Sequence, residues 1–375
     1  MDADAVTRLL GRPRVLGLGE PTHGSTALLT LRNELFRQLV EEAGYRTIAL
    51  ESDCMMGLIA DEYVASGTGG LDEVMERGFS HHELGAGPGN RELVRWMRSY
   101  NDGRPAAEQV HLIGFDGPLE MSHAASPRQA LTALHSYLGE WVDAGPAAVL
   151  DELLGDDDAW TNHDAMMVPS ASIGRSPEAQ QLRLLADELT SVLDTQTPYL
   201  IAATSRDAWD RARLYARTAT GLLRYHACMA APVPDRWARL SGLRDAMMAA
   251  NVIAAAERSP VLVHAHNSHL QRPISTMRMG DQQLEWWSAG AQVSARLGSS
   301  YAVIATAVGT IRAHDVGVPP VDTIEGHLDS LPAQLHDPRQ LPTGFAPRRS
   351  PWFGYAPLDP AQLPTYDGVI YLKEA

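Results

Sequence analysis

The chain has 375 residues, of which 45% are hydrophobic and 21% charged, a balance typical of a folded globular protein. Its 31 basic residues against 46 acidic ones leave a formal charge of -15, which argues against binding to nucleic acid or to an anionic membrane, because both need clustered basic side chains. The first ten residues lack the pattern of a signal peptide, and no apolar run approaches the roughly 18 residues of a membrane span, so we expect a cytoplasmic protein.

Six short apolar runs, each bounded by glycine or polar residues, are typical of buried parallel strands. In chain order they are Val15–Gly19, Thr47–Leu50, Val110–Phe115, Pro260–Ala265, Tyr301–Val308 and Gly368–Leu372. Helical periods separate several of these runs. The pattern therefore predicts an α/β fold with a mostly parallel sheet flanked by helices.

The middle of the chain has a different pattern, because its apolar spacing is helical and only Tyr199–Ala203 is a candidate strand. The helical periods cover residues 130–141, 178–193 and 205–229. We predict an α/β catalytic domain made of residues 1–117 and 242–375. Residues 118–241 are then a helical lobe inserted into that domain and covering its cleft.

Ionisable side chains follow four of the predicted strands. They are Glu20, Glu51, Asp116, and the histidines His264 and His266. Ligands of open parallel sheets bind beyond the carboxyl ends of the strands, so we expect these side chains to converge at one edge. A carboxylate at such a position also commonly caps the next helix, but two carboxylates beside imidazoles form a site that can move protons at neutral pH.

The turn after the first strand reads Gly19-Glu-Pro-Thr-His-Gly24 and leads into a helix. His23 is either an exposed turn residue or a general base, since imidazole titrates near neutrality. In the helix, Arg32 lies within the apolar stripe that includes Phe36. Burying a guanidinium without a partner is costly, so we expect Arg32 to meet a carboxylate or a ligand, as a structural ion pair or as part of the site.

Three histidines, His264, His266 and His269, form a His-x-His-x-x-His cluster. They are candidates for core packing, for proton transfer or for a metal site, although the spacing matches no standard zinc pattern. The sequence does not support a serine or cysteine nucleophile or a nucleotide-binding site. The sequence has no Gly-x-Ser-x-Gly elbow and no phosphate-binding glycine motif, and neither Cys54 nor Cys228 lies in a catalytic context, although the two could form one disulfide.

Taken together, these residues resemble the erythromycin esterase family. Its members carry a Gly-Glu-x-Thr-His-Gly turn, as at Gly19–Gly24, and an arginine nine residues after that histidine, as at Arg32. They also carry an Ala-Leu-Glu strand end, as at Ala49–Glu51, and a His-Asn-x-His segment, as at His266–His269. Weaker similarities occur in the segments Asn90–Asn101, Gly114–Asp116, Arg244–Asn251, Gly290–Gly309 and Tyr366–Tyr371.

The resemblance implies a metal-independent hydrolase without cofactors, acting on a carboxylic ester or lactone, with macrolides as the family's associated substrates. It implies that His23 is the general base, held by a neighbouring carboxylate, and that Glu51 shares or orients that proton or positions the water. Arg32 and His266 would stabilise the charge that develops on the cleaved carbonyl. The residues expected to bind the substrate or support the site are Glu20, His269, Asp116 and Arg244.

Several alternatives stay open. The same His/Glu pair can serve elimination, cyclisation or ring opening, as in an enzyme that tailors a natural product. A metallohydrolase would use His264, His266 and His269, and a non-catalytic binding module would not need a buried Arg32 facing carboxylates. Departures from the family at Pro21, Ala250 and Gly117-Pro118 leave the small-molecule substrate open, and the oligomeric state is equally open.

Overall fold

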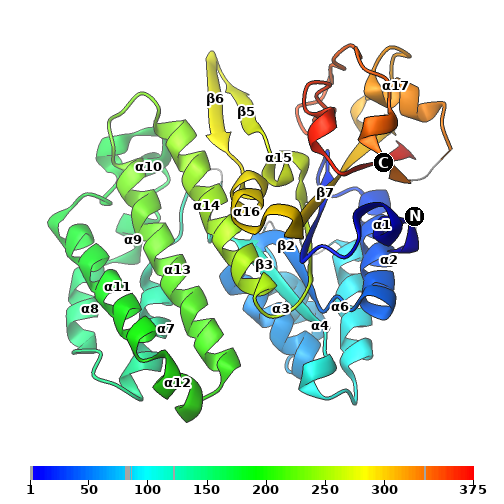
Figure 1. Ribbon diagram of the computed structural model, residues 1–375. Coiled ribbons are helices and arrows are strands. Elements are labelled where there is room, and N and C mark those ends of the chain that lie inside the picture. The colour runs from blue at the N-terminus through cyan, green and yellow to red at the C-terminus, as the bar shows by residue number, and fades with distance from the viewer. Residues whose placement is uncertain (1–2, 81–84, 86, 121–122, 333–334) are drawn as a thin grey trace. The chain divides into compact units, whose positions relative to one another are not determined.

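The computed structural model describes residues 3–80, 85, 87–120, 123–332 and 335–375, and the chain divides into two compact units (Figure 1). The first unit comprises Met1–Phe115, Val252–Thr276 and Trp287–Ala375, and the second comprises Asp116–Asn251 and Met277–Trp286. The predicted lobe, residues 118–241, lies within the first of the two segments of the second unit. That this unit covers a cleft stays a prediction.

The first unit is built on a seven-stranded sheet with the strand order β3-β2-β4-β1-β7-β9-β8. The strands are β1 (Val15–Glu20), β2 (Thr47–Asp53), β3 (His111–Asp116), β4 (Val261–His266), β7 (Tyr301–Thr310), β8 (Leu335–His336) and β9 (Gly368–Glu374). Parallel pairing joins β2 to β4, β4 to β1, β1 to β7 and β7 to β9, whereas β8 is antiparallel to β9. The predicted mostly parallel sheet is confirmed.

Helices flank this sheet. They are α1 (Ala3–Leu10), α2 (Thr26–Ala43), α3 (Cys54–Ser66), α4 (Leu71–Arg77), α6 (Pro88–Asn101), α15 (Asn267–Leu270), α16 (Ala289–Leu297) and α17 (Ile324–Asp329). Helix α2 begins after Ser25, whose hydroxyl accepts a hydrogen bond from the Leu28 amide at 3.4 Å, and ends at Gly44, where φ is 74°. Both signals are local, so the sequence itself determines the length of the helix that follows the Glu20–His23 turn.

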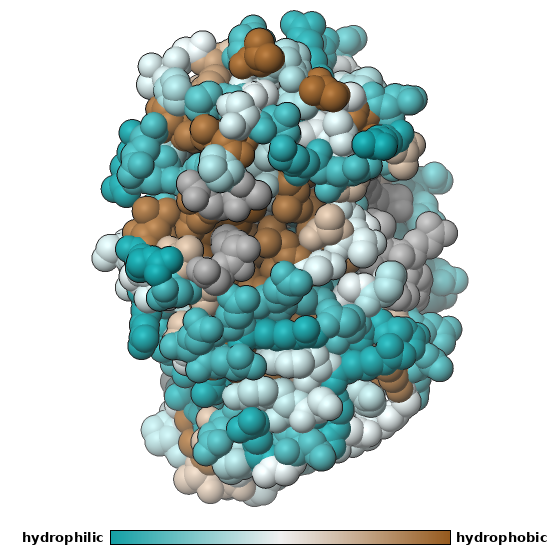
Figure 2. Space-filling view, turned by 90° about the vertical axis from the view of Figure 1, so that its right-hand side faces the viewer, coloured by the Kyte–Doolittle hydropathy of each residue, from teal (hydrophilic) through white to brown (hydrophobic). Residues whose placement is uncertain are grey.

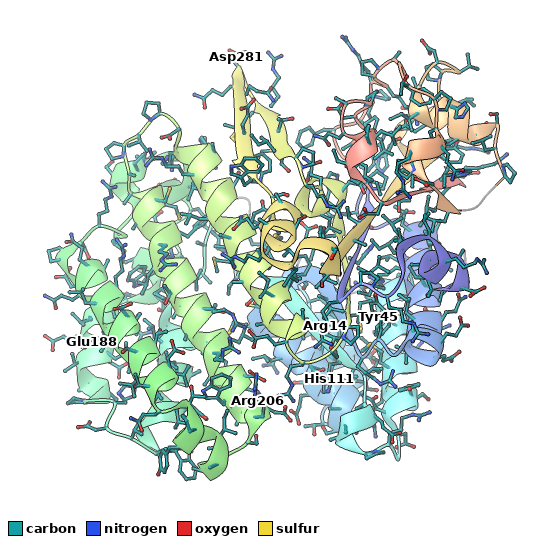
Figure 3. All side chains as sticks on the ribbon, viewed as in Figure 1. Arg14, Tyr45, His111, Glu188, Arg206 and Asp281 are labelled. Atoms are coloured by element: carbon teal, nitrogen blue, oxygen red, sulfur yellow. The ribbon has the colours of Figure 1, made fainter. Side chains whose placement is uncertain are left out.

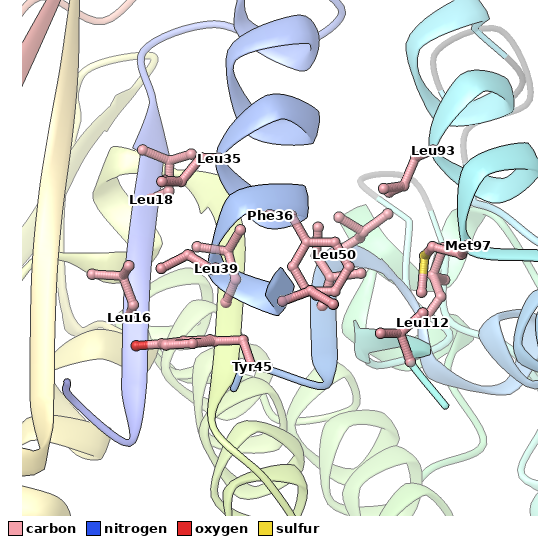
Figure 4. Packing of buried hydrophobic residues seen from close by; sticks show 14 of the residues in the cluster. Leu16, Leu18, Leu35, Phe36, Leu39, Tyr45, Leu50, Leu93, Met97 and Leu112 are labelled. Carbon is pink, nitrogen blue, oxygen red and sulfur yellow. The ribbon is translucent and has the colours of Figure 1, made fainter. Parts of the chain in front are cut away.

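The core packs α2 between two strands and a neighbouring helix (Figure 4). The contacting side chains are Leu35, Phe36 and Leu39 of α2, Leu16 and Leu18 of β1, Leu50 of β2, and Leu93 and Met97 of α6. Each such side chain, when fully buried, stabilises the fold by about 1.5–3 kcal/mol. The side of α2 that carries Phe36 is therefore firmly held against the sheet.

The second unit is helical. Its helices are α7 (Arg128–Gly139), α8 (Ala147–Leu154), α9 (Asp157–Trp160), α10 (Asp164–Met167), α11 (Pro177–Thr195), α12 (Thr197–Ala203), α13 (Arg206–Met229) and α14 (Arg236–Ala256), the last of which continues into the first unit. Helices α7, α11 and α13 share a core that includes Leu134, Leu189 and Ala212 (Figure 1). The predicted helical character is therefore present in the part of this unit that comes from the middle of the chain.

The strand candidate at Tyr199–Ala203 is wrong, because these residues belong to α12. Pro198 occupies its first turn, where its missing N–H costs nothing, and Leu200 packs into the helical core. A two-stranded sheet that was not predicted is formed by β5 (Ile274–Met279) and β6 (Gln282–Trp287), with Asp281 at its tip (Figure 3).

The surface in Figure 2 is largely hydrophilic, with apolar side chains gathered near the middle of the face shown. Among the most exposed apolar residues are Val318, Val321 and Phe353, all in the C-terminal part of the chain. In the described part of the chain, no helix combines the length and the apolar character needed to cross a membrane.

Candidate active site

The turn after β1 is held from two sides. Gly19 lies so close to Asn267 that a Cβ atom there would come within 2.1 Å of Asn267 Oδ1. Asn267 in turn donates from Nδ2 to the Thr306 carbonyl at 2.9 Å and accepts from the Thr306 amide at 3.3 Å. The Pro21 carbonyl accepts a hydrogen bond from the Ala356 amide at 2.9 Å. Glycine at position 19 therefore lets the ends of β1, β4 and β7 meet.

Glu20, the last residue of β1, is buried and lies between two histidines. Its Oε1 lies 2.8 Å from Nδ1 of His23, and its Oε2 lies 3.1 Å from Nε2 of His264. The other ring nitrogen of His264, Nδ1, lies 3.0 Å from the Leu18 carbonyl oxygen. Both ring nitrogens of His264 therefore face acceptor oxygens.

This surrounding holds Glu20 in its ionised form. Burial alone would raise the pKa of the Glu20 carboxyl, but the charge of His264 and the hydrogen bonds from His23 and His264 outweigh burial and lower the pKa to about 2. An ionised Glu20 accepts the Nδ1 hydrogen of His23, which leaves the lone pair of that imidazole on Nε2. The His23 side chain is 44% exposed, so the group positioned by Glu20 is accessible to small molecules.

His266 lies beside His23, with their ring centroids 5.6 Å apart. Nδ1 of His266 accepts from the Ser268 amide at 3.2 Å and lies 2.7 Å from the Ser268 hydroxyl, so the ring hydrogen of the neutral form is on Nε2. Burial, followed by the charge of His23, lowers the pKa of His266 to about 4. At neutral pH, His266 is thus an uncharged hydrogen-bond donor.

Glu51, at the end of the neighbouring strand β2, supports the segment that carries His266. Its Oε2 accepts from the His266 backbone amide at 2.8 Å, and its Oε1 lies 3.4 Å from Nε2 of His269. The expectation that a carboxylate holds His23 is thus met by Glu20, whereas these contacts of Glu51 are with His266 and His269.

Arg32 is buried, as expected from its place in the apolar stripe, and the side chain that accepts its hydrogen bonds is an amide. Its Nε and Nη2 donate to Oδ1 of Asn33 at 3.0 and 2.7 Å, and no described carboxylate oxygen lies within 4 Å of it. Burial lowers the pKa of Arg32 to about 10, and the charge of Glu20 opposes this shift. Asn33 donates onward to the Gly89 carbonyl at 2.8 Å and to the Glu92 carboxylate. An amide thus replaces the expected carboxylate, and Glu20 acts on Arg32 only through space.

Asp116 and Arg244, the remaining predicted residues, bind each other in the second unit. Nε and Nη2 of Arg244 lie 2.9 and 2.5 Å from Oδ2 of Asp116, and Nε is 3.2 Å from Oδ1. Both nitrogens thus converge on one oxygen of the carboxylate, in a charge-assisted pair. A role for either residue in substrate binding stays a prediction.

The histidine cluster divides in the structure. His264 directs its nitrogens at Leu18 and Glu20, whereas His269 lies against Glu51. Across the described ranges, no three His, Cys, Asp or Glu side chains are grouped as a metal site. Neither cysteine is part of a disulfide, so the possible Cys54–Cys228 bond is not formed.

Sequence reasoning missed two supporting residues. Asn33, the residue after Arg32, accepts hydrogen bonds from its guanidinium. Ser268 lies two positions after His266 and donates its backbone amide to the His266 ring, as in a helix cap. The serine could have been found from capping rules alone. The role of Asn33 could not, because its partners Gly89 and Glu92 lie on a distant segment.

Comparison with known proteins gives one family match and several structural matches. The model of the family described as erythromycin esterase matches residues 40–374, a range that includes Glu51 and the histidine cluster but begins after Arg32. The erythromycin esterase type II of Escherichia coli is 28% identical over 120 residues, which cover 31% of this chain and 26% of that protein. The chain therefore aligns with only about a quarter of that relative's length.

Solved structures share the fold at low sequence identity. A Bacillus cereus protein superposes with a TM-score of 0.73 at 17% identity, covering 98% of this chain and 90% of the other. A mutant of the erythromycin esterase EreC in its open conformation superposes with a TM-score of 0.70 at 20% identity, covering 99% and 93%. These likenesses show the fold alone. Because the family model spans nearly all of the sequence beyond residue 39, this chain belongs to the erythromycin esterase family.

Proposed function

We propose that this protein hydrolyses a carboxylic ester or lactone, using His23 as the base that activates water and no metal ion. One observation carries the proposal. The exposed imidazole of His23 is bound through Nδ1 to a buried carboxylate whose pKa is lowered to about 2, which is how a general base is oriented and its protonated form stabilised.

In the proposed reaction, Nε2 of His23 takes a proton from water as the water oxygen adds to the ester carbonyl carbon. Glu20 stabilises the imidazolium that results. The carbonyl oxygen becomes an oxyanion, and Nε2–H of His266 donates a hydrogen bond to it. When the intermediate collapses, the bond to the alkoxide breaks and His23 returns its proton to that leaving group, giving a carboxylic acid and an alcohol.

The other residues have supporting roles in this proposal. Glu51 holds the His266 amide and His269, which keeps the donor of the oxyanion hydrogen bond in place. Arg32 contributes a buried positive charge near Glu20 and the developing oxyanion. In the family whose model matches this chain, macrolides are the natural first candidates for the substrate, and we include them among the esters to be tested.

The test is a mass-spectrometric screen of macrolides, simple lactones and p-nitrophenyl esters with the wild-type protein. Hydrolysis adds the mass of one water to a lactone. His23→Asn is then compared with His135→Asn, a change of the same kind at a histidine in the second unit that bonds the Gly145 carbonyl. Loss of turnover in the first variant alone supports the proposal, and equal turnover in both contradicts it.

A product of unchanged mass would favour the alternative chemistry, in which the same base removes a proton for isomerisation or cyclisation. Full activity after dialysis against a chelator is the result we expect, and activity restored only by added Zn²⁺ would overturn the metal-independent proposal.

A further inference from the structure

The second unit contains a cavity of about 340 Å³, a size typical of small-molecule sites. It lies among α11, α13 and α14, which contribute all of its lining. The apolar part of the lining includes Leu193, Ala216 and Met247. We call this cavity, with its lining residues on α11, α13 and α14, the arginine pocket.

The charged side chains of the arginine pocket are three arginines, Arg213, Arg217 and Arg224, and one aspartate, Asp194. At 100° per residue, the three arginines fall within an arc of roughly 40° on α13. One helix face thus presents a stripe of positive charge to the cavity. The stripe stands out in a chain whose formal charge is -15, because the long-range field of such a protein repels anions.

Two of the arginines are oriented by neighbouring side chains. Arg217 donates from Nε to Oδ1 of Asn251 on α14 at 3.1 Å. Arg213 lies 3.4 Å from Asp210 and 4.7 Å from the ring of Trp209. Because these contacts fix the planes of the guanidinium groups, less side-chain entropy is lost when an anion binds.

Arg224 is exposed and forms no hydrogen bond or ion pair with any residue that the structure describes. A guanidinium with open donors at the rim of a cavity is suited to binding a carboxylate or phosphate through two parallel hydrogen bonds. The apolar residues of the same lining are suited to the apolar part of the molecule.

We propose that the arginine pocket binds a small organic anion, with its carboxylate or phosphate at the arginine stripe and its apolar chain against Leu193, Ala216 and Met247. The observation is the placement of three arginines on one face of α13 at a cavity of ligand size. The proposal does not depend on ester hydrolysis, because it concerns residues other than those of the proposed reaction and is tested by binding alone.

The experiment is isothermal titration calorimetry of the full chain with hexanoate, hexyl phosphate and hexanamide. We expect both anions to bind, the neutral amide to bind at least about tenfold more weakly, and the anion affinity to fall as salt is added. Equal affinity for hexanoate and hexanamide would overturn the proposal, as would the absence of heat with either anion.

Two variants locate the site. Arg224→Gln should weaken hexanoate binding by about fivefold to tenfold, whereas Arg183→Gln, which removes the same charge from an exposed position of α11 outside the lining, should leave it unchanged. Ala246→Asp, which places a carboxylate in the lining, should also abolish binding. Equal effects of the Arg224 and Arg183 variants would show that binding depends only on net charge and would contradict the site.

Kinetics then show whether the bound anion also acts on the enzyme. If it is an effector, hexanoate alters the rate with neutral esters in the wild type and loses that effect in Arg224→Gln. An effect of hexanoate that persists unchanged in Arg224→Gln would contradict the arginine pocket as its site.

Discussion

The carboxylate of Glu20 joins His23 to His264, one imidazole 44% exposed and the other 5% exposed. The two histidines approach different oxygens of the same group, at 2.8 and 3.1 Å. Because His264 is also held by the Leu18 carbonyl, the position of the exposed imidazole is determined by the sheet itself. A chain of three side chains therefore connects the rigid core to the group that we propose as the base.

Replacing Glu20 with Gln keeps the size of the side chain and removes its charge. We expect kcat to fall by about 10²–10⁴-fold with little change in KM, because an amide neither stabilises the His23 imidazolium nor selects the Nδ1–H form. Steady-state kinetics on any ester that the wild type hydrolyses provide the measurement. A variant with wild-type kcat would show that His23 does not depend on Glu20.

His266 offers a test based on pH. Its pKa is lowered from 6.5 to about 4 in the folded protein, so the unfolded chain binds more protons between these values. Stability from this group is complete above pH 6.5 and is lost as the pH falls towards 4. His266→Asn keeps a side chain that can cap α15 but does not titrate.

We therefore expect the wild type to lose unfolding free energy relative to His266→Asn as the pH falls from 6.5 to 4. Urea unfolding at several pH values in this window gives that difference. A constant difference would mean that His266 is not held neutral by its surroundings. The variant should also lose about 10²-fold or more in kcat if Nε2–H binds the oxyanion.

Gly19 is expected to tolerate no side chain. In Gly19→Ala the new Cβ would lie 2.1 Å from Asn267 Oδ1, so either the end of β1 or the Asn267 side chain must move. We expect a loss of stability of about 1–3 kcal/mol together with reduced activity. Gly44→Ala is a useful comparison, because nothing lies within 4 Å of its added Cβ and its cost comes from φ alone, which is 74°. Equal activity in Gly19→Ala and the wild type would contradict the close packing of these strands.

The sequence was sufficient for six of the seven strands of the sheet, all but β8, and for the meeting of Glu20 with His266 at its edge. Buried parallel strands are continuous apolar runs, so each of the six could be located, and the ends of β1 and β4 necessarily brought Glu20 and His266 together once the strands paired. The sequence could not show which residue each of these side chains contacts. His264 was a candidate core residue, and only its position 3.1 Å from Glu20 shows that it contacts the carboxylate that also holds His23.

The helical phase of Arg32 correctly predicted its burial, but the partner depended on tertiary structure. A guanidinium needs acceptors, and periodicity cannot distinguish a carboxylate from the amide of the next residue. The error at Tyr199–Ala203 has a similar origin. A short apolar run fits a strand or a buried helix equally well, and here packing in the helical unit decided between them.

Asn33→Leu tests how the buried charge of Arg32 is stabilised. The variant keeps the branched shape of the side chain but removes the acceptor of two hydrogen bonds, of 3.0 and 2.7 Å, together with the donor to Gly89 and Glu92. Hydrogen bonds to a charged group contribute about 1.5–3 kcal/mol, so we expect the unfolding free energy to fall by roughly 3 kcal/mol. Arg46→Gln serves as the comparison, since Arg46 donates only to backbone carbonyls. A smaller loss in Asn33→Leu than in the comparison would indicate that Glu20 alone stabilises Arg32.

Glu325 holds the segment that supports the Glu20–His23 turn. The fully buried carboxylate accepts from the Leu358 amide at 3.0 Å, and the nearby Ala356 amide donates to Pro21 at 2.9 Å. Its Oε2 has no hydrogen-bond partner among the residues described. Burial raises the pKa of Glu325 in the folded protein above its ordinary 4.5. The contribution of the protonated side chain to the free energy of unfolding is therefore fully present below pH 4.5, and it is lost as the pH rises through the pKa of the folded protein.

Glu325→Gln keeps an acceptor for the Leu358 amide and removes the titration. We therefore expect the variant to gain unfolding free energy relative to the wild type as the pH rises from 4.5 towards neutrality, while its kcat stays close to that of the wild type because the Pro21 contact is retained. Glu188→Gln, which changes an exposed glutamate of α11 (Figure 3), should follow the wild-type pH profile. Parallel profiles for all three proteins would show that the buried carboxylate of Glu325 does not oppose folding at neutral pH.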